Sequence, residues 1–273
     1  MLDNYQTSFL SNIKDIIGRH WLRRRPHLKI LDMGCEPGGH QLKAIAELTS
    51  GEVFGINVPE NFPSPEAITV AGDRVRMLRM DGMNLEFEDS TFDLVISANV
   101  IEHAPNPDRF ISEAARVLKP DGVCFIETAP VWTSARGHHI MEMMVAENCP
   151  QETAFIDDGS VIPEWAHLNL SRDELERILA EKLQPETVQY ILWYLYDSND
   201  LCKRPWSSLS ESFHRHFPHM HLMPRPLPGI DLSKMPADGH EDYLVYGFKA
   251  VGRKRALGPV ASRLYWRLRK LGL

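Results

Sequence analysis

Residues 30–39, Ile-Leu-Asp-Met-Gly-Cys-Glu-Pro-Gly-Gly, join an apolar run to a turn that is rich in glycine. A helical pattern follows directly, over residues 41–48. Glycines let a ligand approach the backbone closely, and the first turn of a helix presents unpaired N–H groups to an anionic group. The stretch therefore predicts the strand, turn and helix of a nucleotide-binding crevice.

Apolar runs alternate with helical patterns on the carboxyl side of this stretch. Strands are predicted at 28–33, 53–58, 75–80, 92–98, 122–128, 187–195 and 242–251, and helices at 41–48, 109–118 and 172–182. Ser171, with Glu174 three residues later, caps the last of these helices. Several strands, such as 94–96, are continuously apolar, which is typical of strands buried on both faces. The alternation predicts an α/β fold with a parallel sheet covered on both sides.

Composition narrows the class of protein. The chain has 273 residues, of which 43% are hydrophobic and 25% charged, as expected of a globular protein. Its net charge of −7 argues against a general nucleic-acid binder. The four cysteines are scattered and contain no CxxC pair, so we expect reduced thiols. Without a membrane-spanning run or a signal-peptide pattern at the start, we expect a cytoplasmic protein.

Further motifs follow in the order of the expected strands. Asn57 ends the second strand, residues 79–83 (RMDGM) end the third, residues 92–103 (FDLVISANVIEH) contain the fourth, and residues 116–122 (RVLKPDG) end a helix. Together with the glycine turn, these motifs resemble the class I S-adenosylmethionine-dependent methyltransferases. The branch in question has an LDxGCGxG turn, an FDLVxxxxVIEH strand and an RVLKPDG helix end. The resemblance covers roughly residues 28–130 and implies a Rossmann-like, seven-stranded, mostly parallel sheet.

The resemblance also implies a cofactor, S-adenosylmethionine, and the residues that bind it. The implied cofactor-binding residues are Asp32, Gly34, Cys35, Glu36, Gly38, Asn57, Asp81, Gly82, Met83 and Ala98. By this implication Asp32, Gly34 and Gly38 line the methionine end, Asn57 faces the ribose, Asp81 and Gly82 hold the adenine, and Ala98 lies beneath the sulfonium. Asp93 is expected to be structural.

Two residues depart from the pattern of the branch. Glu36 replaces a glycine of the turn, and its charge repels a carboxylate but attracts an ammonium group. Asn57 replaces an acidic residue, and its side chain accepts hydrogen bonds only through its carbonyl oxygen. Both changes predict weaker or altered cofactor binding. A catalytically silent protein with this fold therefore remains an alternative.

Histidines are the candidate catalytic residues. His103 follows the fourth strand, and His138 and His139 lie in a loop after the fifth. Each is a candidate base that removes a proton from an acceptor, although adjacent histidines on a loop point in different directions and are not expected to hold one metal. The combination of residues 130–132 (PVW), 136–139 (RGHH) and 165–168 (WAHL) is similar to methyltransferases of polysaccharide and glycan biosynthesis. The predicted function is O-methylation of a sugar hydroxyl in a polysaccharide, glycolipid or nucleotide-sugar pathway. A natural-product methyltransferase is the nearest alternative, and a nicotinamide-dependent oxidoreductase ranks last.

The chain is predicted to divide into five parts. These are an N-terminal helical segment (1–26), the cofactor-binding core (27–130), a substrate cap with one core helix and strand (131–240), the last core strand (241–252) and a basic amphipathic tail (253–273). The long segments 129–170 and 196–241 are the candidates for covering the ligand edge. His214, His216, His219 and His221 match no zinc pattern, so they are interpreted as incidental to a surface lid and no metal ligand is assigned.

The tail is the strongest basic feature of the chain. Residues 253–273 contain seven basic residues and no acidic one, with an apolar stripe at Val260, Leu264, Leu268 and Leu271. This pattern indicates peripheral contact of 257–273 with an anionic membrane surface. The alternative is a terminal helix that packs on its own domain or on the partner of a homodimer.

Overall fold

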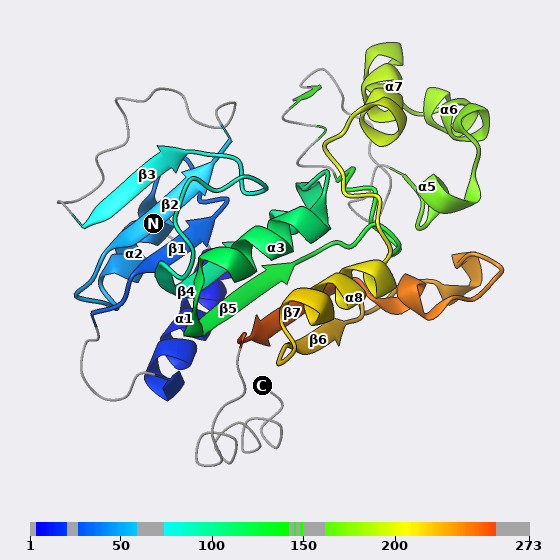
Figure 1. The fold of residues 1–273 in the computed structure, drawn as a ribbon. Helices are drawn as coiled ribbons and strands as arrows, with labels where there is room; N and C mark the ends of the chain where they lie inside the picture. Colours follow the sequence, from blue (N-terminus) through cyan, green and yellow to red (C-terminus); the bar gives the residue numbers. More distant parts are fainter. Residues whose placement is uncertain are drawn as a thin grey trace.

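The computed structural model describes residues 4–20, 27–58, 74–141, 145, 148–149 and 162–254. Within these residues, seven strands form one sheet in the order β3-β2-β1-β4-β5-β7-β6 (Figure 1). The strands are β1 (Ile30–Met33), β2 (Val53–Asn57), β3 (Val75–Arg79), β4 (Phe92–Ala98), β5 (Leu118–Thr128), β6 (His221–Arg225) and β7 (Gly247–Gly252). The sheet confirms the predicted α/β fold of the Rossmann-like class I methyltransferase type.

The first five strands run parallel, so their carboxyl ends meet at one edge of the sheet. Ile30 of β1 pairs with Val53 of β2 on one side and with Leu94 of β4 on the other. The order of the strands reverses at this point, and ligands of open α/β sheets bind outside the carboxyl ends where the order reverses. β7 runs antiparallel to β5, and β6 pairs antiparallel with β7 at the edge.

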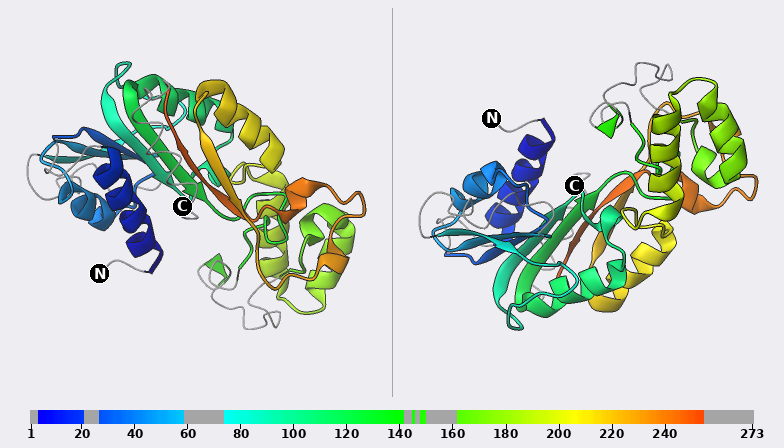
Figure 2. Two further views of the ribbon diagram at one scale, coloured as in Figure 1. Left: turned by 90° about the horizontal axis from the view of Figure 1, so that it is seen from below. Right: turned by 90° about the horizontal axis from the view of Figure 1, so that it is seen from above.

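Helices cover both faces of the sheet, as the apolar strands predict. α1 (Asn4–His20) and α2 (His40–Ala46) pack on one face, and α3 (Pro107–Val117) and α8 (Trp206–His216) on the other (Figure 2). On the first face the ring of Phe9 stacks on Phe125, with centroids 5.4 Å apart. On the second face Phe213 meets Phe248 edge to face at 5.5 Å. All four residues of β1 are buried, because there is no solvent side to the centre of the sheet.

A third apolar cluster, besides the two that cover the sheet, lies beyond the carboxyl end of β5 (Figure 1). Its helices are α5 (Ala166–Asn169), α6 (Arg172–Ala180) and α7 (Pro185–Leu192), continued by a π-helical turn, η4 (Trp193–Asp197). Its buried members include Ile140, Leu175, Leu179, Ile191 and Leu195. We call the described residues between 132 and 201 the helical lobe. Its core is separate from the two clusters that cover the sheet.

The predicted strand at 187–195 is wrong, because this segment forms α7 and the following π-helical turn. Its β-branched residues favoured a strand, but its buried positions, 188, 191, 192 and 195, recur at helical spacing. Pro185 stands in the first turn of the helix, where its lack of an N–H costs nothing. The sheet takes β6 in place of the predicted strand.

The predicted strand at 242–251 begins later than expected. Glu241–Leu244 form a short 3-10 turn, and β7 starts at Gly247. The buried Asp242 carboxylate accepts hydrogen bonds from the backbone N–H and the hydroxyl of Ser207 at 2.8 and 2.7 Å. These bonds fix Asp242 beside the start of α8, so the chain turns there and cannot pair with β5.

The roles of two segments are exchanged relative to the prediction. Residues 206–225, expected in a lid, form α8 and β6 of the sheet layers. The helix predicted at 172–182 is present as α6 but packs in the helical lobe. Its predicted cap is confirmed, because Ser171 N–H donates to Glu174 at 2.8 Å and Glu174 N–H donates to the Ser171 hydroxyl at 3.3 Å.

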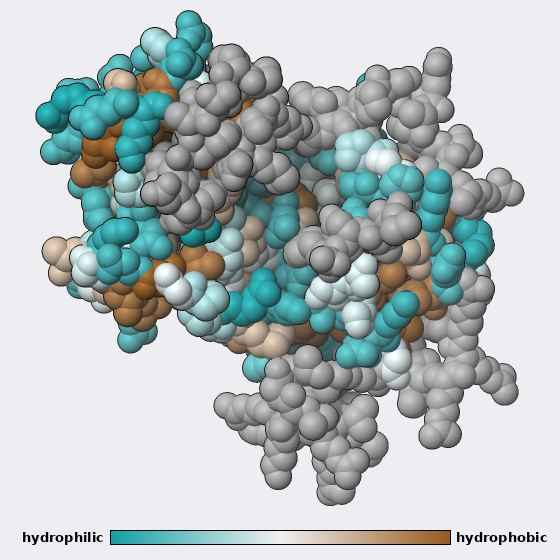
Figure 3. Space-filling model, turned by 180° about the vertical axis from the view of Figure 1, so that it is seen from behind, coloured by the Kyte–Doolittle hydropathy of each residue, from teal (hydrophilic) through white to brown (hydrophobic). Residues whose placement is uncertain are grey.

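The described residues do not test the predicted contact of residues 257–273 with a membrane. No helix in the described ranges is long and apolar enough to cross a membrane. Hydrophobic residues on the face drawn in Figure 3 form separate patches among hydrophilic ones. The basic tail lies outside the described residues from 255 onward, so its membrane contact stays a prediction.

Candidate active site

The glycine turn after β1 is held against the neighbouring strands by backbone contacts. The N–H groups of Gly34 and Cys35 both donate to the carbonyl oxygen of Ile56, at 2.8 and 2.9 Å. Gly34 has φ +92°, and a Cβ at this position would collide with the side chain of Val100. Only glycine fits here without strain. The turn therefore touches the segment that follows β4.

Two carboxylates stand at this turn. Asp32 is 1% exposed at the centre of the sheet edge, and burial, together with the nearby charge of Glu36, raises its pKa to about 7 although Gln41 donates a hydrogen bond to it at 3.3 Å. Glu36 accepts from the backbone N–H of Gln41 at 2.9 Å, in the first turn of α2. A cationic ammonium group placed between these carboxylates would relieve their mutual repulsion. The turn therefore fits the amino group of the methionine portion of S-adenosylmethionine.

Asn57 has a structural reason to differ from an acidic residue. Its amide nitrogen donates to the carbonyl oxygen of Cys35 at 3.0 Å, and its amide oxygen accepts from Val58 N–H at 2.8 Å. A carboxylate cannot make the first of these bonds, because it has no hydrogen to donate at neutral pH. Asn57 thus ties the end of β2 to the glycine turn. Cys35 takes part through its backbone, since burial raises the pKa of its thiol and its sulfur packs under Gly55.

The loop after β3 is a compact turn. Asp81 is exposed and accepts from the N–H of Met83 at 2.8 Å. A Cβ on Gly82 would lie 2.6 Å from the ring of Phe110, so close packing on α3 requires glycine there. Arg109 of α3 donates to the carbonyl oxygen of Met83 at 3.0 Å. The loop is held in one conformation beside the sheet edge, where the resemblance places the adenine.

The two remaining cofactor-binding predictions lie at the same edge. Ala98 is half-buried and ends β4. Gly38 is exposed, and a Cβ there would come within 3.3 Å of both the Glu36 carboxylate and the His40 ring. All ten predicted cofactor-binding residues therefore belong to the carboxyl ends of β1 to β4 and the turns that follow them, and their roles toward the cofactor stay predictions.

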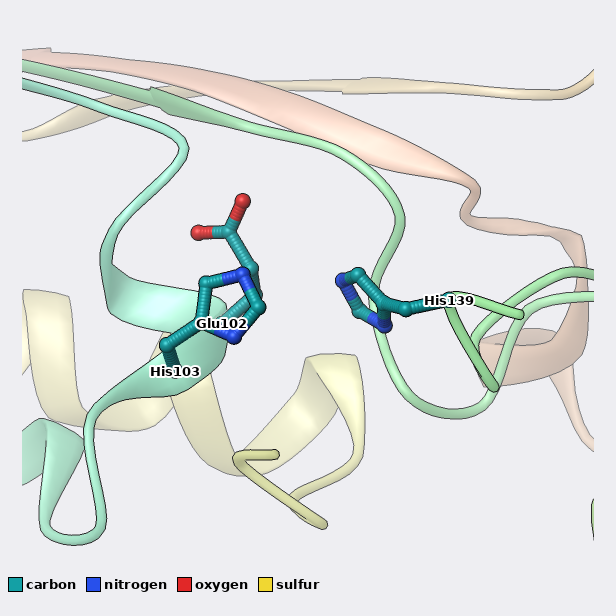
Figure 4. A group of neighbouring side chains, drawn as sticks. All are labelled: Glu102, His103 and His139. Atoms are coloured by element: carbon teal, nitrogen blue, oxygen red, sulfur yellow. The ribbon is translucent and has the colours of Figure 1, made fainter. Parts of the chain in front are cut away.

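Glu102, His103 and His139 form a group at the same edge (Figure 4). Glu102 and His103 come from the short 3-10 helix η3 (Ile101–His103) after β4, and His139 comes from the loop after β5. One carboxylate oxygen and one ring nitrogen from each histidine lie within 4.8 Å of one another. Two predicted catalytic residues are thus brought together with an acidic residue that had no assigned role.

The hydrogen bonds of the two histidines settle which nitrogen carries the proton. His103 Nδ1 lies 2.7 Å from the carbonyl oxygen of Asp200, and His139 Nδ1 lies 2.8 Å from that of Gly137. A carbonyl oxygen only accepts, so each Nδ1 carries a hydrogen, and in the neutral form of either ring the lone pair is on Nε2. Within the described chain, His139 Nε2 has no hydrogen-bond partner. The lone pairs are available to a ligand.

Burial sets the charges of this group. Glu102 is 5% exposed, its Oε2 has no partner among the described residues, and burial raises its pKa to about 8. Burial, followed by the nearby charge of His103, lowers the pKa of His139 to about 3. At neutral pH the group therefore has a neutral His139 and a protonated Glu102 carboxyl.

His138 points away from this group, as expected of adjacent histidines on a loop. His139 has φ +60°, and the left-handed turn separates the two rings. The ring of His138 is fully buried 5.3 Å from that of His167, which itself meets Trp132 at 4.7 Å. His138 Nδ1 accepts from Ile140 N–H at 3.0 Å, so its lone pair is already used. This geometry favours a packing role for His138 over a base role.

Sequence reasoning passed over two features of the site. Glu102 lies inside the quoted VIEH motif, so its signal was present, but only the histidine was given a role. The second feature is the carbonyl oxygen of Asp200, which orients the ring of His103. Asp200 lies 97 residues further along the chain, and no sequence pattern predicts this contact. Of the histidines at 214–221, His216 pairs with Asp108 at 3.1 Å, and within the described ranges none joins a metal-binding group.

Comparisons with known proteins agree with the class that the fold and site define. Residues 31–126, the span from β1 to β5, match the methyltransferase domain family. A structure from Listeria monocytogenes described as an S-adenosylmethionine dependent methyltransferase superposes with a TM-score of 0.51 at 14% identity, covering 93% of this chain and 100% of that one. The sequence match covers the span from β1 to β5 and the structural likeness shows the fold, and the cofactor that a methyltransferase domain implies is S-adenosylmethionine.

The curated relatives resemble part of the chain. The sterol 24-C-methyltransferase of Gibberella zeae is 32% identical over 108 residues, which cover 38% of this chain and 28% of that protein. The sterol 24-C-methyltransferase of Saccharomyces cerevisiae is 29% identical over 177 residues, covering 60% and 43%. Cycloartenol-C-24-methyltransferase 1 of Oryza sativa is 38% identical over 105 residues, covering 37% and 30%. The chain spans less than half the length of each of these relatives.

Proposed function

We propose that this protein is an S-adenosylmethionine-dependent methyltransferase that methylates a hydroxyl oxygen of a small molecule, with a sugar of a polysaccharide, glycolipid or nucleotide-sugar pathway as the acceptor class. One observation carries the choice of oxygen. In the neutral form of His103 the lone pair is on Nε2, because Nδ1 donates to the carbonyl oxygen of Asp200, and the ring lies beside Glu102 and His139 at the sheet edge (Figure 4). A hydroxyl must lose its proton during methylation, and a positioned imidazole accepts it.

Each residue of the group has a separate role in this proposal. S-adenosylmethionine, when bound, supplies an electrophilic methyl group. The Asp200 carbonyl holds the Nδ1–H of His103, so the opposite nitrogen is aimed at the acceptor hydroxyl and takes its proton. His139 is neutral and a weak base, so it accepts a hydrogen bond from the acceptor and orients it. The helical lobe lies beside this edge, beyond the carboxyl end of β5.

The curated relatives favour a second candidate, methyl transfer to carbon. Their names describe sterol and cycloartenol C-24 methylation, and their likeness covers 60% and 37% of this chain. Methyl transfer to an alkene carbon leaves a cation that must also lose a proton, so a base such as His103 has a role in this candidate too. The fold is compatible with both candidates, because fold does not determine the acceptor.

An acceptor screen with matched variants separates these candidates. The protein is incubated with S-adenosylmethionine and either sugars, nucleotide sugars or sterols, and S-adenosylhomocysteine is measured. We expect turnover with a sugar class, and about a hundredfold lower rate for His103→Gln. His214→Gln, an exposed histidine of α8, is the control and should retain the rate. Turnover only with sterols, or a His103→Gln enzyme of full activity, would reject the proposal for oxygen.

Cofactor binding is tested independently of the acceptor. Calorimetric titration with S-adenosylmethionine should show binding to the wild type and weaker binding to Asp81→Ala, whose circular dichroism should be unchanged because Asp81 is exposed. Equal affinity would show that the loop after β3 does not hold the cofactor. Binding without transfer to any acceptor would favour the catalytically silent alternative.

A further inference from the structure

We propose that Glu102, His103 and His139 bind one divalent first-row transition-metal ion through Glu102 Oε2 and the Nε2 atoms of the two histidines. This function was not assigned to any residue by the sequence motifs. Two imidazoles and one carboxylate form a donor set that holds zinc, iron and related ions in proteins. Within the part of the chain that the structure describes, no other set of three or more such groups converges in this way.

The first argument is the convergence of donor atoms without partners. Glu102 Oε2 and His139 Nε2 are buried, and neither has a hydrogen-bond partner among the described residues. A buried polar atom without a partner is costly, so it needs a compensating ligand. The candidate ligand atoms lie within 4.8 Å of one another. Ligands of one ion at about 2.1 Å lie roughly 3 to 3.5 Å apart, so side-chain shifts of about 1 Å suffice to close the site.

The second argument is that hydrogen bonds to backbone carbonyls already orient both imidazole rings. Metal-binding histidines almost always donate their other ring N–H to a backbone carbonyl or a carboxylate. His103 donates to the carbonyl of Asp200 at 2.7 Å, and His139 donates to the carbonyl of Gly137 at 2.8 Å. The same tautomer is therefore fixed twice, by backbone atoms from two separate loops. Both rings are oriented before an ion arrives.

The third argument is the position and composition of the site. Magnesium, calcium and manganese prefer sites built from oxygen, whereas imidazole nitrogens suit zinc, copper, iron and nickel. Three protein ligands leave at least one position open, as in catalytic zinc sites. His103 is exposed, so the open position is accessible from solvent. The first proposed ligand, Glu102, comes two residues after Val100, which contacts Gly34 of the cofactor turn.

A metal ion at this site would also affect the proposed methyl transfer, and this part of the inference rests on the proposed function. A bound ion polarises an acceptor hydroxyl and lowers its pKa, so the hydroxyl proton can pass to water. The ion uses the same lone pairs that otherwise contact the hydroxyl. Metal binding itself requires neither the cofactor nor an acceptor, so it can be tested even where no transfer is observed.

The test is cobalt binding to the full chain after treatment with a chelator and its removal. Co²⁺ is followed by its visible absorption and by calorimetry, without cofactor or acceptor. We expect one ion per chain, an affinity at least tenfold weaker in both Glu102→Gln and His139→Gln, and unchanged affinity in the control His214→Gln/His219→Gln. Competition by Zn²⁺ should remove the absorption.

Two further readouts keep the result decisive. Circular dichroism without metal shows whether each variant is folded, and the ion should raise the melting temperature of the wild type but not of the variants. If one variant fails to fold, the other decides the question, because Glu102→Gln preserves shape whereas His139→Gln removes a ring. The proposal would be overturned if the wild type did not bind Co²⁺, if both folded variants bound it with wild-type affinity, or if the control lost binding.

Discussion

The sheet and the helical lobe differ in how far their structures follow from local sequence. Strands β1, β2 and β4 and residues 122–128 of β5 are buried almost throughout, and they lie where apolar runs predict them, whereas the edge strand β3 has two exposed arginines. The lobe is built from short amphipathic helices, and residues as distant as Ile140 and Leu201 meet in its core. A strand that is buried on both faces can be predicted from its own residues. A short helix depends on the tertiary contacts that bury its apolar side.

Phe125→Ala tests the sheet and should have the largest effect. Phe125 is 1% exposed in β5 and stacks on Phe9 of α1. Removing the ring should lower the free energy of unfolding by about 3–5 kcal/mol, as measured by urea denaturation. Leu232→Ala, at a residue that is 55% exposed, should change it by less than about 0.5 kcal/mol. Equal effects of the two variants would contradict the burial described for the sheet.

Ile191→Ala tests whether the lobe is energetically separate from the sheet. Ile191 is fully buried in α7, and its truncation should cost about 2–5 kcal/mol. We expect faster hydrogen exchange across α6 and α7, unchanged protection of β1 to β5, and S-adenosylmethionine affinity within twofold of the wild type. The exposed neighbour Trp193→Ala is the control. Loss of protection throughout the sheet would show that the two regions unfold as one unit.

The pH dependence of cofactor affinity tests the carboxylates of the sheet edge. Asp32 faces Gln41, Glu36 and Cys35, and burial raises its pKa from 3.8 to about 7. Without cofactor, the folded state keeps a proton between these values that the unfolded chain has lost, so the unfolding free energy falls as pH rises through this window.

The charged form of Asp32 is the one that attracts an ammonium group. Affinity for S-adenosylmethionine should therefore rise from pH 6 to pH 8, by at most about tenfold per unit below the pKa. Calorimetry across this range measures the slope. Asp32→Asn should bind more weakly and with little dependence on pH, and an equally steep slope in that variant would assign the titration to another group.

Ser171→Ala should have the smallest effect, and it tests the one feature of the lobe that the sequence predicts well. The variant loses the hydroxyl that caps α6, at a cost of about 1 kcal/mol. Ser171→Asp keeps an acceptor at the cap and should lose less than half as much. Thermal unfolding followed by circular dichroism compares the two. Identical melting temperatures for the wild type and Ser171→Ala would remove the capping box as a source of stability.

The errors of prediction have a common cause. Residues 187–195 combine β-branched side chains with apolar positions at helical spacing, and only packing in the lobe selects the helix. β6 contains a proline and has no fully buried residue, so its short pattern is weak, yet pairing with β7 makes it a strand. Local propensity decides little where an element is short and lies at an edge.

Within the site, the sequence determined the chemistry of each turn. The order of Asp32, Gly34, Asp81 and His103 along the chain fixes a parallel sheet edge, because parallel strands present their carboxyl ends together. The structural role of Asn57 could not be predicted from the sequence, because it depends on the Cys35 carbonyl that the fold brings to its amide.

Only the tertiary structure decided which histidines work together. His138 and His139 are equivalent in the sequence, but a left-handed turn sends one ring into the lobe and the other to Glu102 and His103. Backbone carbonyls that come from different parts of the fold then fix the tautomers. The sequence determined which donor groups exist, and the packing of the lobe against the sheet edge determined which of them converge, because convergence depends on distances between segments that are far apart in the chain.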